Sequence, residues 1–212
     1  MKEISKILLD IKAVSLNPEN PYTWASGIKS PIYCDNRLLL SYPEERDIVE
    51  KNLVKLIKEK YPDVEYIMGT ATAGIPHAAL IADKMKLPMG FVRSGNKDHG
   101  KGNKIEGEIF KGKKVLVIED LFSTGGSSIN AAIALRQAGF DVIGVIAIFS
   151  YNLKACKENF DKNNLSFASL TDYDELIDIA LEINYIKESH LKKLKRWKQD
   201  PNDESWMTEE WN

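Results

Sequence analysis

Two adjacent carboxylates, Glu119 and Asp120, stand between an apolar run and a turn rich in glycine and hydroxyl groups. The apolar run, residues 115–118, predicts a buried strand, and the turn, residues 123–128, predicts the start of a helix. Backbone N–H groups at a helix start have no partner within the helix, and small residues let a phosphate approach them. The carboxylates would repel that phosphate, so they should face hydroxyl groups, a cation, or a cationic centre that forms during a reaction. The segment therefore predicts a sugar-phosphate site, unless the carboxylates only end the strand and a turn hydroxyl only caps the helix.

Residues 69–74, Gly-Thr-Ala-Thr-Ala-Gly, form a second turn of small residues. The glycine spacing is that of a Walker A loop, but Ile75 and Pro76 stand where lysine and serine or threonine are required. We interpret this turn as a second candidate anion site made from backbone N–H groups. An ordinary strand-to-helix connector is the alternative.

Residues 93–107 combine four glycines with five cationic or imidazole side chains, which is too irregular for a stable element. They follow an apolar stretch, residues 89–92, which is expected to be a strand. A loop of this kind can close over a polyanion and exclude water, and its cations can neutralise the charge of an anion that leaves during a reaction. We therefore predict a basic flap, with plain solvent exposure as the alternative. Its charged side chains are Arg93, Lys97, His99, Lys101 and Lys104.

The elements that must position these residues alternate along the chain. Apolar strands rich in valine, isoleucine and leucine are followed by amphipathic helices, which indicates an α/β fold with a mainly parallel twisted sheet flanked by helices. In such sheets ligands bind beyond the carboxyl ends of the strands. The expected strands are residues 65–69, 89–92, 115–118 and 142–149, and the expected helices are 3–13, 75–84, 127–138 and 152–161, with another beginning near Pro43.

The composition is that of an ordinary folded protein. With 212 residues, 43% of them hydrophobic and 28% charged, the chain is expected to form one domain. A formal net charge of −2 argues against a nucleic-acid partner. The longest strongly apolar stretch, residues 142–149, is too short to span a membrane, and we expect a cytoplasmic protein. Cys34 and Cys156 lack metal-binding spacing, so we expect two buried free thiols and no metal ligands from the protein.

These motifs, in this order, resemble those of the type I phosphoribosyltransferases, and within them the orotate phosphoribosyltransferases. Residues 115–128 are similar to the family signature that binds 5-phosphoribosyl 1-diphosphate. Residues 24–33, Trp-Ala-Ser-Gly-Ile-Lys-Ser-Pro-Ile-Tyr, resemble the N-terminal hood of the orotate branch. The residues that resemble its flap are Arg93, Lys97, His99-Gly100 and Ile105-Glu106-Gly107.

The resemblance implies transfer of the phosphoribosyl group from 5-phospho-α-D-ribose 1-diphosphate to orotate, giving orotidine 5′-phosphate and pyrophosphate in de novo UMP synthesis. It implies Mg²⁺ as the cofactor, carried by the diphosphate without direct protein ligands. Lys97, Glu119 and Asp120 are the implied catalytic residues, and Ser123 and Lys29 are the implied contacts to orotate. The residues implied to bind the phosphoribosyl diphosphate are Arg93, Lys97, His99, Glu119, Asp120, Leu121, Phe122, Ser123, Thr124, Gly125, Gly126 and Ser127.

The resemblance also implies how the chain is organised and assembled. One phosphoribosyltransferase domain would cover residues 1–212, with a small hood at about 1–42, a core at about 43–185, and a C-terminal helix and tail at 186–212. A homodimer is implied in which Arg93, Lys97 and His99 of one subunit act on the other subunit's site.

Three positions depart from the family pattern. Ser94, Ala73 and Ala25 stand where many relatives carry lysine. Losing three cations at an anion site removes strong charge-assisted hydrogen bonds. We interpret the chain as a member of a subclass that relies on backbone N–H groups, Lys29 and the flap, and weaker binding of the diphosphate is the alternative.

Two other functions stay open. A phosphoribosyltransferase for a purine base would share the diphosphate site, and residues 149–151 offer aromatic rings for a base. A non-catalytic regulator that senses the phosphoribosyl diphosphate and binds nucleic acid would need a basic surface. Its support is the basic run of residues 192–198, which we otherwise expect to be a solvated helix face.

Overall fold

The computed structural model describes residues 2–95 and 104–208, which divide into two compact units. The terminal unit joins residues 1–42 with residues 171–212, and the central unit covers residues 43–170. None of the described helices is both long and apolar enough to span a membrane.

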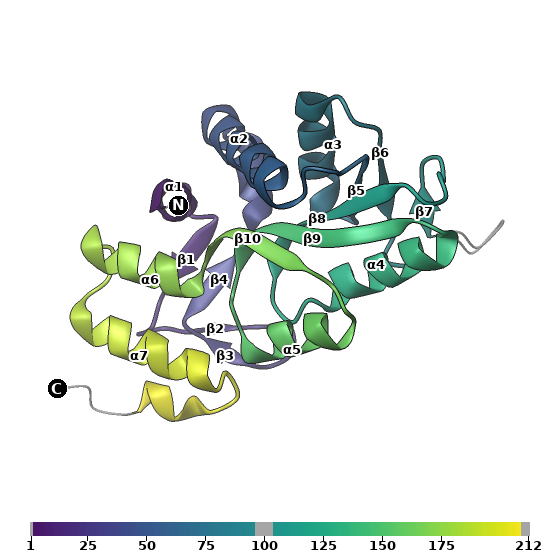
Figure 1. Cartoon of the computed structure of the whole chain (residues 1–212). Helices are drawn as coiled ribbons and strands as arrows, with labels where there is room; N and C mark the ends of the chain where they lie inside the picture. Colours follow the sequence, from purple (N-terminus) through teal and green to yellow (C-terminus); the bar gives the residue numbers. More distant parts are fainter. Residues whose placement is uncertain (1, 96–103, 209–212) are drawn as a thin grey trace. The chain divides into compact units, whose positions relative to one another are not determined.

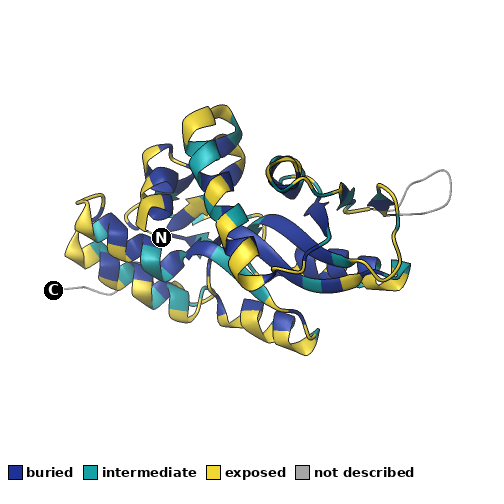
Figure 2. Ribbon diagram, turned by 45° about the horizontal axis from the view of Figure 1, so that its top comes forward, coloured by how far each residue is buried: buried dark blue, intermediate teal, exposed yellow. Residues whose placement is uncertain are grey.

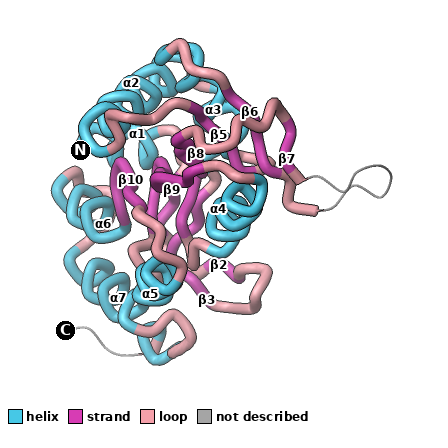
Figure 3. The backbone as a smooth tube through the Cα atoms, turned by 45° about the vertical axis from the view of Figure 1, so that its right-hand side comes forward, coloured by secondary structure: helices cyan, strands magenta, loops and turns pink. Residues whose placement is uncertain are grey.

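A six-stranded sheet forms the middle of the central unit (Figure 1). Its strands are β5 (Tyr66–Thr70), β6 (Met89–Val92), β7 (Ile105–Glu106), β8 (Lys114–Phe122), β9 (Asp141–Ser150) and β10 (Phe167–Asp172). Their order in the sheet is β10-β9-β8-β5-β6-β7 (Figure 3). β5 pairs in parallel with β6 and β8, β8 pairs in parallel with β9, and β7 runs antiparallel to β6. The mainly parallel sheet confirms the predicted fold class.

Helices cover both faces of this sheet (Figure 1), and its strands form the buried middle of the unit (Figure 2). Two helices lie over one face, α2 (Pro43–Lys60) and α3 (Gly74–Met85), and two over the other, α4 (Gly126–Ala138) and α5 (Lys154–Lys162). The helix expected to begin near Pro43 does so, and it buries the apolar face that the spacing predicts, Val49, Leu53, Leu56 and Ile57.

Strand β8 is longer than the sequence predicts. We expected it to end at Ile118, before the two carboxylates, but it continues through Phe122. Its pairing with β5 ends at Ile118, whereas β9 continues alongside, with Leu121 opposite Phe149 and Phe122 opposite Ser150. Because β9 supplies hydrogen bonds over this extra length, the carboxylates are held by an ordered strand and not by a turn.

The terminal unit combines helices with two small antiparallel sheets, β1–β4 and β2–β3. Its elements are α1 (Lys2–Asp10), β1 (Val14–Leu16), β2 (Tyr22–Thr23), β3 (Lys29–Ser30), β4 (Ile32–Cys34), η1 (Asn36–Ser41), α6 (Tyr173–Glu182), α7 (Glu188–Gln199) and η2 (Glu204–Met207). Hydrogen bonds join the two ends of the chain within this unit. The hydroxyls of Ser5 and Thr171 lie 2.6 Å apart, and Trp197 Nε1 donates to the Lys29 carbonyl over 3.0 Å.

Candidate active site

Glu119 is buried at the carboxyl end of β8 and accepts hydrogen bonds from the start of α4. Its Oε2 accepts from the hydroxyls of Ser127 at 2.9 Å and Ser128 at 3.1 Å, and its Oε1 accepts from the Asp120 backbone N–H at 3.1 Å. Burial, followed by the negative charge of Asp120, raises the pKa of Glu119 to about 7, although hydrogen bonds from Thr70 and Ser127 act in the opposite direction. This carboxyl group therefore changes its charge near neutral pH.

The predicted phosphate turn lines an open cavity of about 240 Å³. Gly125 adopts the left-handed conformation there, with φ +79°, and a Cβ at this position would lie 2.6 Å from Cε2 of Phe160. Both facts favour glycine. Helix α4 begins at Gly126, so its first N–H groups have no partner within the helix. The residues that line the cavity are Glu119, Asp120, Leu121, Ser123, Thr124, Gly125, Gly126 and Ser127.

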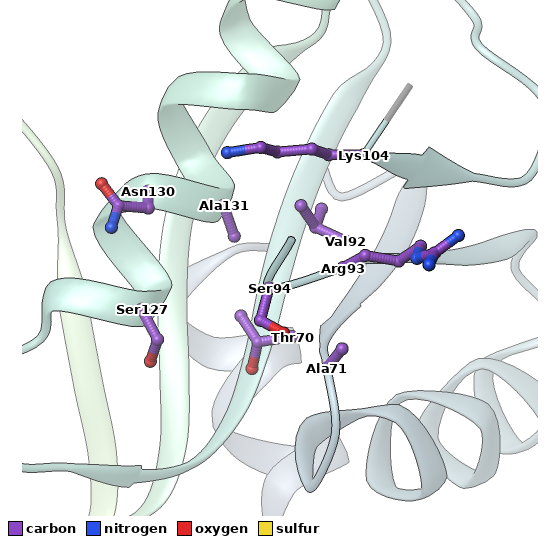
Figure 4. A pocket seen from close by; sticks show the side chains of 9 residues that line it. All are labelled: Thr70, Ala71, Val92, Arg93, Ser94, Lys104, Ser127, Asn130 and Ala131. Atoms are coloured by element: carbon purple, nitrogen blue, oxygen red, sulfur yellow. The ribbon is translucent and has the colours of Figure 1, made fainter. Parts of the chain in front are cut away.

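A second cavity, of about 350 Å³, lies where β5 and β6 end (Figure 4). Its wall offers two cationic groups, three hydroxyls and an amide, and none of its lining residues is a carboxylate. Such a wall suits an anion. Because Ser127 lines both cavities, they adjoin at the first turn of α4. The residues that line the second cavity are Thr70, Ala71, Val92, Arg93, Ser94, Lys104, Ser127, Asn130 and Ala131.

The structure thus brings together the carboxylate pair and the phosphate turn, but one residue predicted with them lies elsewhere. The side chain of Phe122 is fully buried and packs edge-on against Phe160 and Phe167, at centroid distances of 5.2 and 5.9 Å. It is part of the hydrophobic core and lines neither cavity.

The residues predicted to contact the diphosphate from the flap and the lysine predicted to contact the base lie in different parts of the chain. Arg93 lines the second cavity, and its Nη1 lies 3.4 Å from Glu106 Oε1. Lys97 and His99 lie outside the described residues. Lys29 belongs to the terminal unit, where its ammonium group donates a 2.8 Å hydrogen bond to the Thr23 hydroxyl.

The three positions that lack the family lysine lie in three different parts of the structure. Ser94 lines the second cavity, and Ala73 is the residue before α3. Ala25 lies between β2 and β3 of the terminal unit.

Sequence reasoning missed three residues of this region. Asn130 follows Ser127 by three positions, so it lies on the same helix face, and this spacing was an available signal. Lys104 was assigned to the flap but not to the site, although its carbonyl accepts a 2.8 Å hydrogen bond from the Arg93 N–H. Ser128 carried no separate signal, because only the fold shows that its buried hydroxyl reaches a carboxylate.

The basic run on α7 is neutralised by carboxylates of its own unit, which weakens the regulator interpretation. Because most of its cations form ion pairs with carboxylates in the described residues, α7 offers little unpaired positive charge to a nucleic acid. The ion pairs are Lys193 with Glu19, Lys195 with Asp178, Arg196 with Asp203, and Lys198 with Asp174.

The two cysteines differ in burial. Cys156 is a buried free thiol as predicted, and burial raises its pKa to about 11. Cys34 also forms no disulfide, but it is only half-buried, at the end of β4, which corrects the expectation that it is buried. Within residues 2–95 and 104–208, no three histidine, cysteine or acidic side chains gather in a group that could hold a metal ion.

Comparison with known sequences gives consistent matches. Residues 38–176 match the model of the phosphoribosyl transferase domain. The chain is 58% identical to the orotate phosphoribosyltransferase of Bacillus pumilus, over 98% of both chains. It is 57% identical to the orotate phosphoribosyltransferase of Bacillus subtilis, over 96% of this chain and 94% of the relative.

Comparison with solved structures agrees. The chain resembles the UMP synthase of Leishmania donovani, with a TM-score of 0.79 and 27% identity, over 93% of this chain and 42% of that chain. It shares the fold of the orotate phosphoribosyltransferase of Aeropyrum pernix, with a TM-score of 0.75 and 24% identity, over 87% of this chain and 99% of that chain.

Proposed function

This chain belongs to the phosphoribosyltransferase family and, within it, to the orotate phosphoribosyltransferases, and from this premise we propose how its two cavities divide one substrate between them. The chain transfers the phosphoribosyl group of 5-phospho-α-D-ribose 1-diphosphate to orotate, giving orotidine 5′-phosphate and pyrophosphate on the route to UMP. The substrate carries a phosphate at one end of the ribose and a diphosphate at the other. It therefore needs two anion sites separated by a sugar.

The single observation that carries this division is the shared residue Ser127, which lines both cavities. The 5-phosphate would bind at the phosphate turn, where the first N–H groups of α4 attract an anion. The diphosphate would bind in the larger cavity, against Arg93 and the backbone at Ala71. The ribose would then lie at the junction, within reach of the carboxylates Glu119 and Asp120.

The carboxylates suit the chemistry at the ribose. Displacement at the anomeric carbon builds positive charge on the sugar ring and negative charge on the departing pyrophosphate. Asp120 and ionised Glu119 would hold the ribose hydroxyls and stabilise the cationic ring. Arg93 would stabilise the leaving anion, together with Lys97 and His99 of the flap. Ser123 and Lys29 would contact orotate.

Three further features belong to this proposal. Mg²⁺ would be carried by the diphosphate, whose oxygens are the ligands this ion prefers, and it would neutralise charge on the leaving group. The chain would act as a homodimer, with the flap residues Lys97 and His99 of one subunit serving the partner subunit's site, whereas Arg93, which the resemblance also placed in trans, lines the larger cavity of its own subunit. We place the reaction in the cytoplasm, in keeping with a route that supplies UMP there.

Binding of the two halves of the substrate tests the division between cavities. Ribose 5-phosphate and pyrophosphate with Mg²⁺ should bind at the same time, because they would occupy adjoining spaces. Calorimetric titration of pyrophosphate should therefore give nearly the same site number with and without saturating ribose 5-phosphate. Mutually exclusive binding would contradict the proposal.

A further inference from the structure

Lys104 is a cationic residue of the larger cavity whose side chain pairs with no other side chain among residues 2–95 and 104–208. It lines this cavity together with Arg93, yet its ammonium group forms no ion pair with any residue in 2–95 or 104–208. Other lysines of the central unit do pair with carboxylates, as Lys84 does with Asp47 and Lys113 with Glu65. An unpaired cation in a cavity without a carboxylate points to a ligand that supplies the negative charge.

The backbone fixes Lys104 beside Arg93. Val92 pairs with Ile105 across the antiparallel strands β6 and β7, and the Arg93 N–H donates to the Lys104 carbonyl over 2.8 Å. The two cations are therefore cross-strand neighbours, an arrangement that is unfavourable unless their side chains diverge or a negative charge lies near them. Glu106 balances the charge of Arg93 alone: its Oε1 lies 3.4 Å from Arg93 Nη1.

The two side chains take different directions. In Figure 4, Lys104 extends across the cavity toward Asn130 of α4, whereas Arg93 points away from that helix. Lys104 thus supplies a positive charge on the α4 side of the cavity, the side on which Ser127 adjoins the phosphate turn.

We propose that Lys104 binds the pyrophosphate portion of the substrate and of the product, with Asn130 as a neutral hydrogen-bonding partner on the opposite wall. This inference rests on the assignment of the diphosphate to the larger cavity. It also gives a physical reason why Ser94, which lines the same cavity, can lack a charge.

The test compares Lys104→Gln with Lys104→Arg and with the control Lys111→Gln. Lys111 is an exposed lysine of the central unit that lines neither cavity. Lys104→Gln should raise KM for the phosphoribosyl diphosphate and the dissociation constant of Mg²⁺-pyrophosphate by about fivefold to tenfold, the usual effect of losing one partly exposed charge-assisted hydrogen bond. KM for orotate and the thermal unfolding midpoint should stay unchanged. Lys104→Arg should retain most of the affinity, and Lys111→Gln all of it.

Unchanged pyrophosphate affinity in Lys104→Gln, or an equal loss in Lys111→Gln, would overturn the inference. The calorimetric titration needs no turnover. If the wild-type chain binds pyrophosphate but transfers nothing to orotate, the proposed function fails while the role of Lys104 is still decided by the titration.

Discussion

The Ser127 hydroxyl donates a 2.9 Å hydrogen bond to Glu119 Oε2, and it does so from the first turn of α4. The turn that offers N–H groups to a phosphate is thus tied to the carboxylate that would face the ribose. Because hydrogen bonds to an ionised carboxylate favour its charged form, ligand binding at this turn and the protonation of Glu119 should influence each other.

Replacing Glu119 by glutamine should change how stability depends on pH. The folded state raises the pKa of this group from 4.5 to about 7, so it binds the proton more tightly than the unfolded chain does. The contribution of Glu119 to stability is therefore fully present below pH 4.5 and is lost as the pH rises toward 7. In Glu119→Gln the side-chain carbonyl can still accept a hydrogen bond from the Asp120 N–H. The side-chain NH₂ group can donate to the hydroxyl oxygens of Ser127 and Ser128.

Thermal unfolding at pH 5 and pH 8 measures this effect. The quantity to compare is the unfolding midpoint of Glu119→Gln minus that of wild type. This difference should be larger at pH 8 than at pH 5, by about 2–4 °C for each kcal/mol that ionised Glu119 costs the wild-type protein. Glu65→Gln is the control: nearby Lys113 lowers the pKa of this exposed carboxyl below 4.5, so it is ionised at both pH values and its midpoint difference from wild type should be nearly the same at pH 5 and pH 8. An identical midpoint difference at both pH values would contradict the burial of an ionisable Glu119.

Gly125→Ala should destabilise the protein more than Gly112→Ala does. Both glycines have nearly the same positive φ, +79° and +81°, so the backbone strain of an alanine is the same, about 1–2 kcal/mol. At Gly125 the new methyl group would also meet the Phe160 ring at 2.6 Å, whereas at Gly112 it would meet nothing within 4 Å. Overpacking of this kind adds about 1–3 kcal/mol.

Urea unfolding of the two glycine variants gives the comparison directly. KM for the phosphoribosyl diphosphate should also rise in Gly125→Ala alone, because the phosphate turn has to shift. Equal stability losses in the two variants would show that Phe160 does not constrain the turn.

His77 and Glu50 form a buried pair between α2 and α3 that should respond non-additively to mutation. His77 Nδ1 lies 2.6 Å from Glu50 Oε1, both residues are almost fully buried, and burial raises the pKa of Glu50. In the described part of the chain, Glu50 Oε2 and His77 Nε2 have no hydrogen-bond partner. His77→Leu should therefore cost about 3–5 kcal/mol of unfolding free energy, because it strands a buried carboxyl group.

The double variant His77→Leu/Glu50→Leu should regain more than half of that loss, since it removes the stranded group as well. A double-mutant cycle measured by urea unfolding supplies the coupling free energy. Additive losses would mean that the two side chains do not depend on each other.

Mixing two inactive variants tests whether the flap acts on the partner subunit. Lys97→Ala and Asp120→Ala should each lose most activity, while their hybrid dimer should contain one intact site and recover up to about a quarter of wild-type activity, from random subunit exchange. Exchange is checked by mixing differently tagged subunits. Absence of recovery despite exchange would indicate that the flap acts on its own subunit's site.

Much of the fold was predictable because its pattern is local. The apolar face of α2 and the alternation of strands with helices follow from hydrophobic spacing. The end of β8 was not predictable, since it depends on how far β9 extends beside it. Nor was the packing of α7, where Trp197 donates to the carbonyl of Lys29, a residue far away in sequence.

The site shows the same division. The sequence motif located the carboxylates and the turn, because strand, turn and helix start are neighbours in the chain. It could not assign Ser128 or Lys104, because their contacts with Glu119 and with the Arg93 backbone form only when α4 and the strands have folded, nor could it show that Phe122 faces the core.

The most direct test of the account is the loss of orotate absorbance in the presence of Mg²⁺ and 5-phosphoribosyl 1-diphosphate, with adenine, hypoxanthine, xanthine and uracil assayed in parallel. The account predicts turnover that requires the diphosphate and is confined to orotate. Turnover of a purine base in place of orotate, or no turnover with any base, would contradict it.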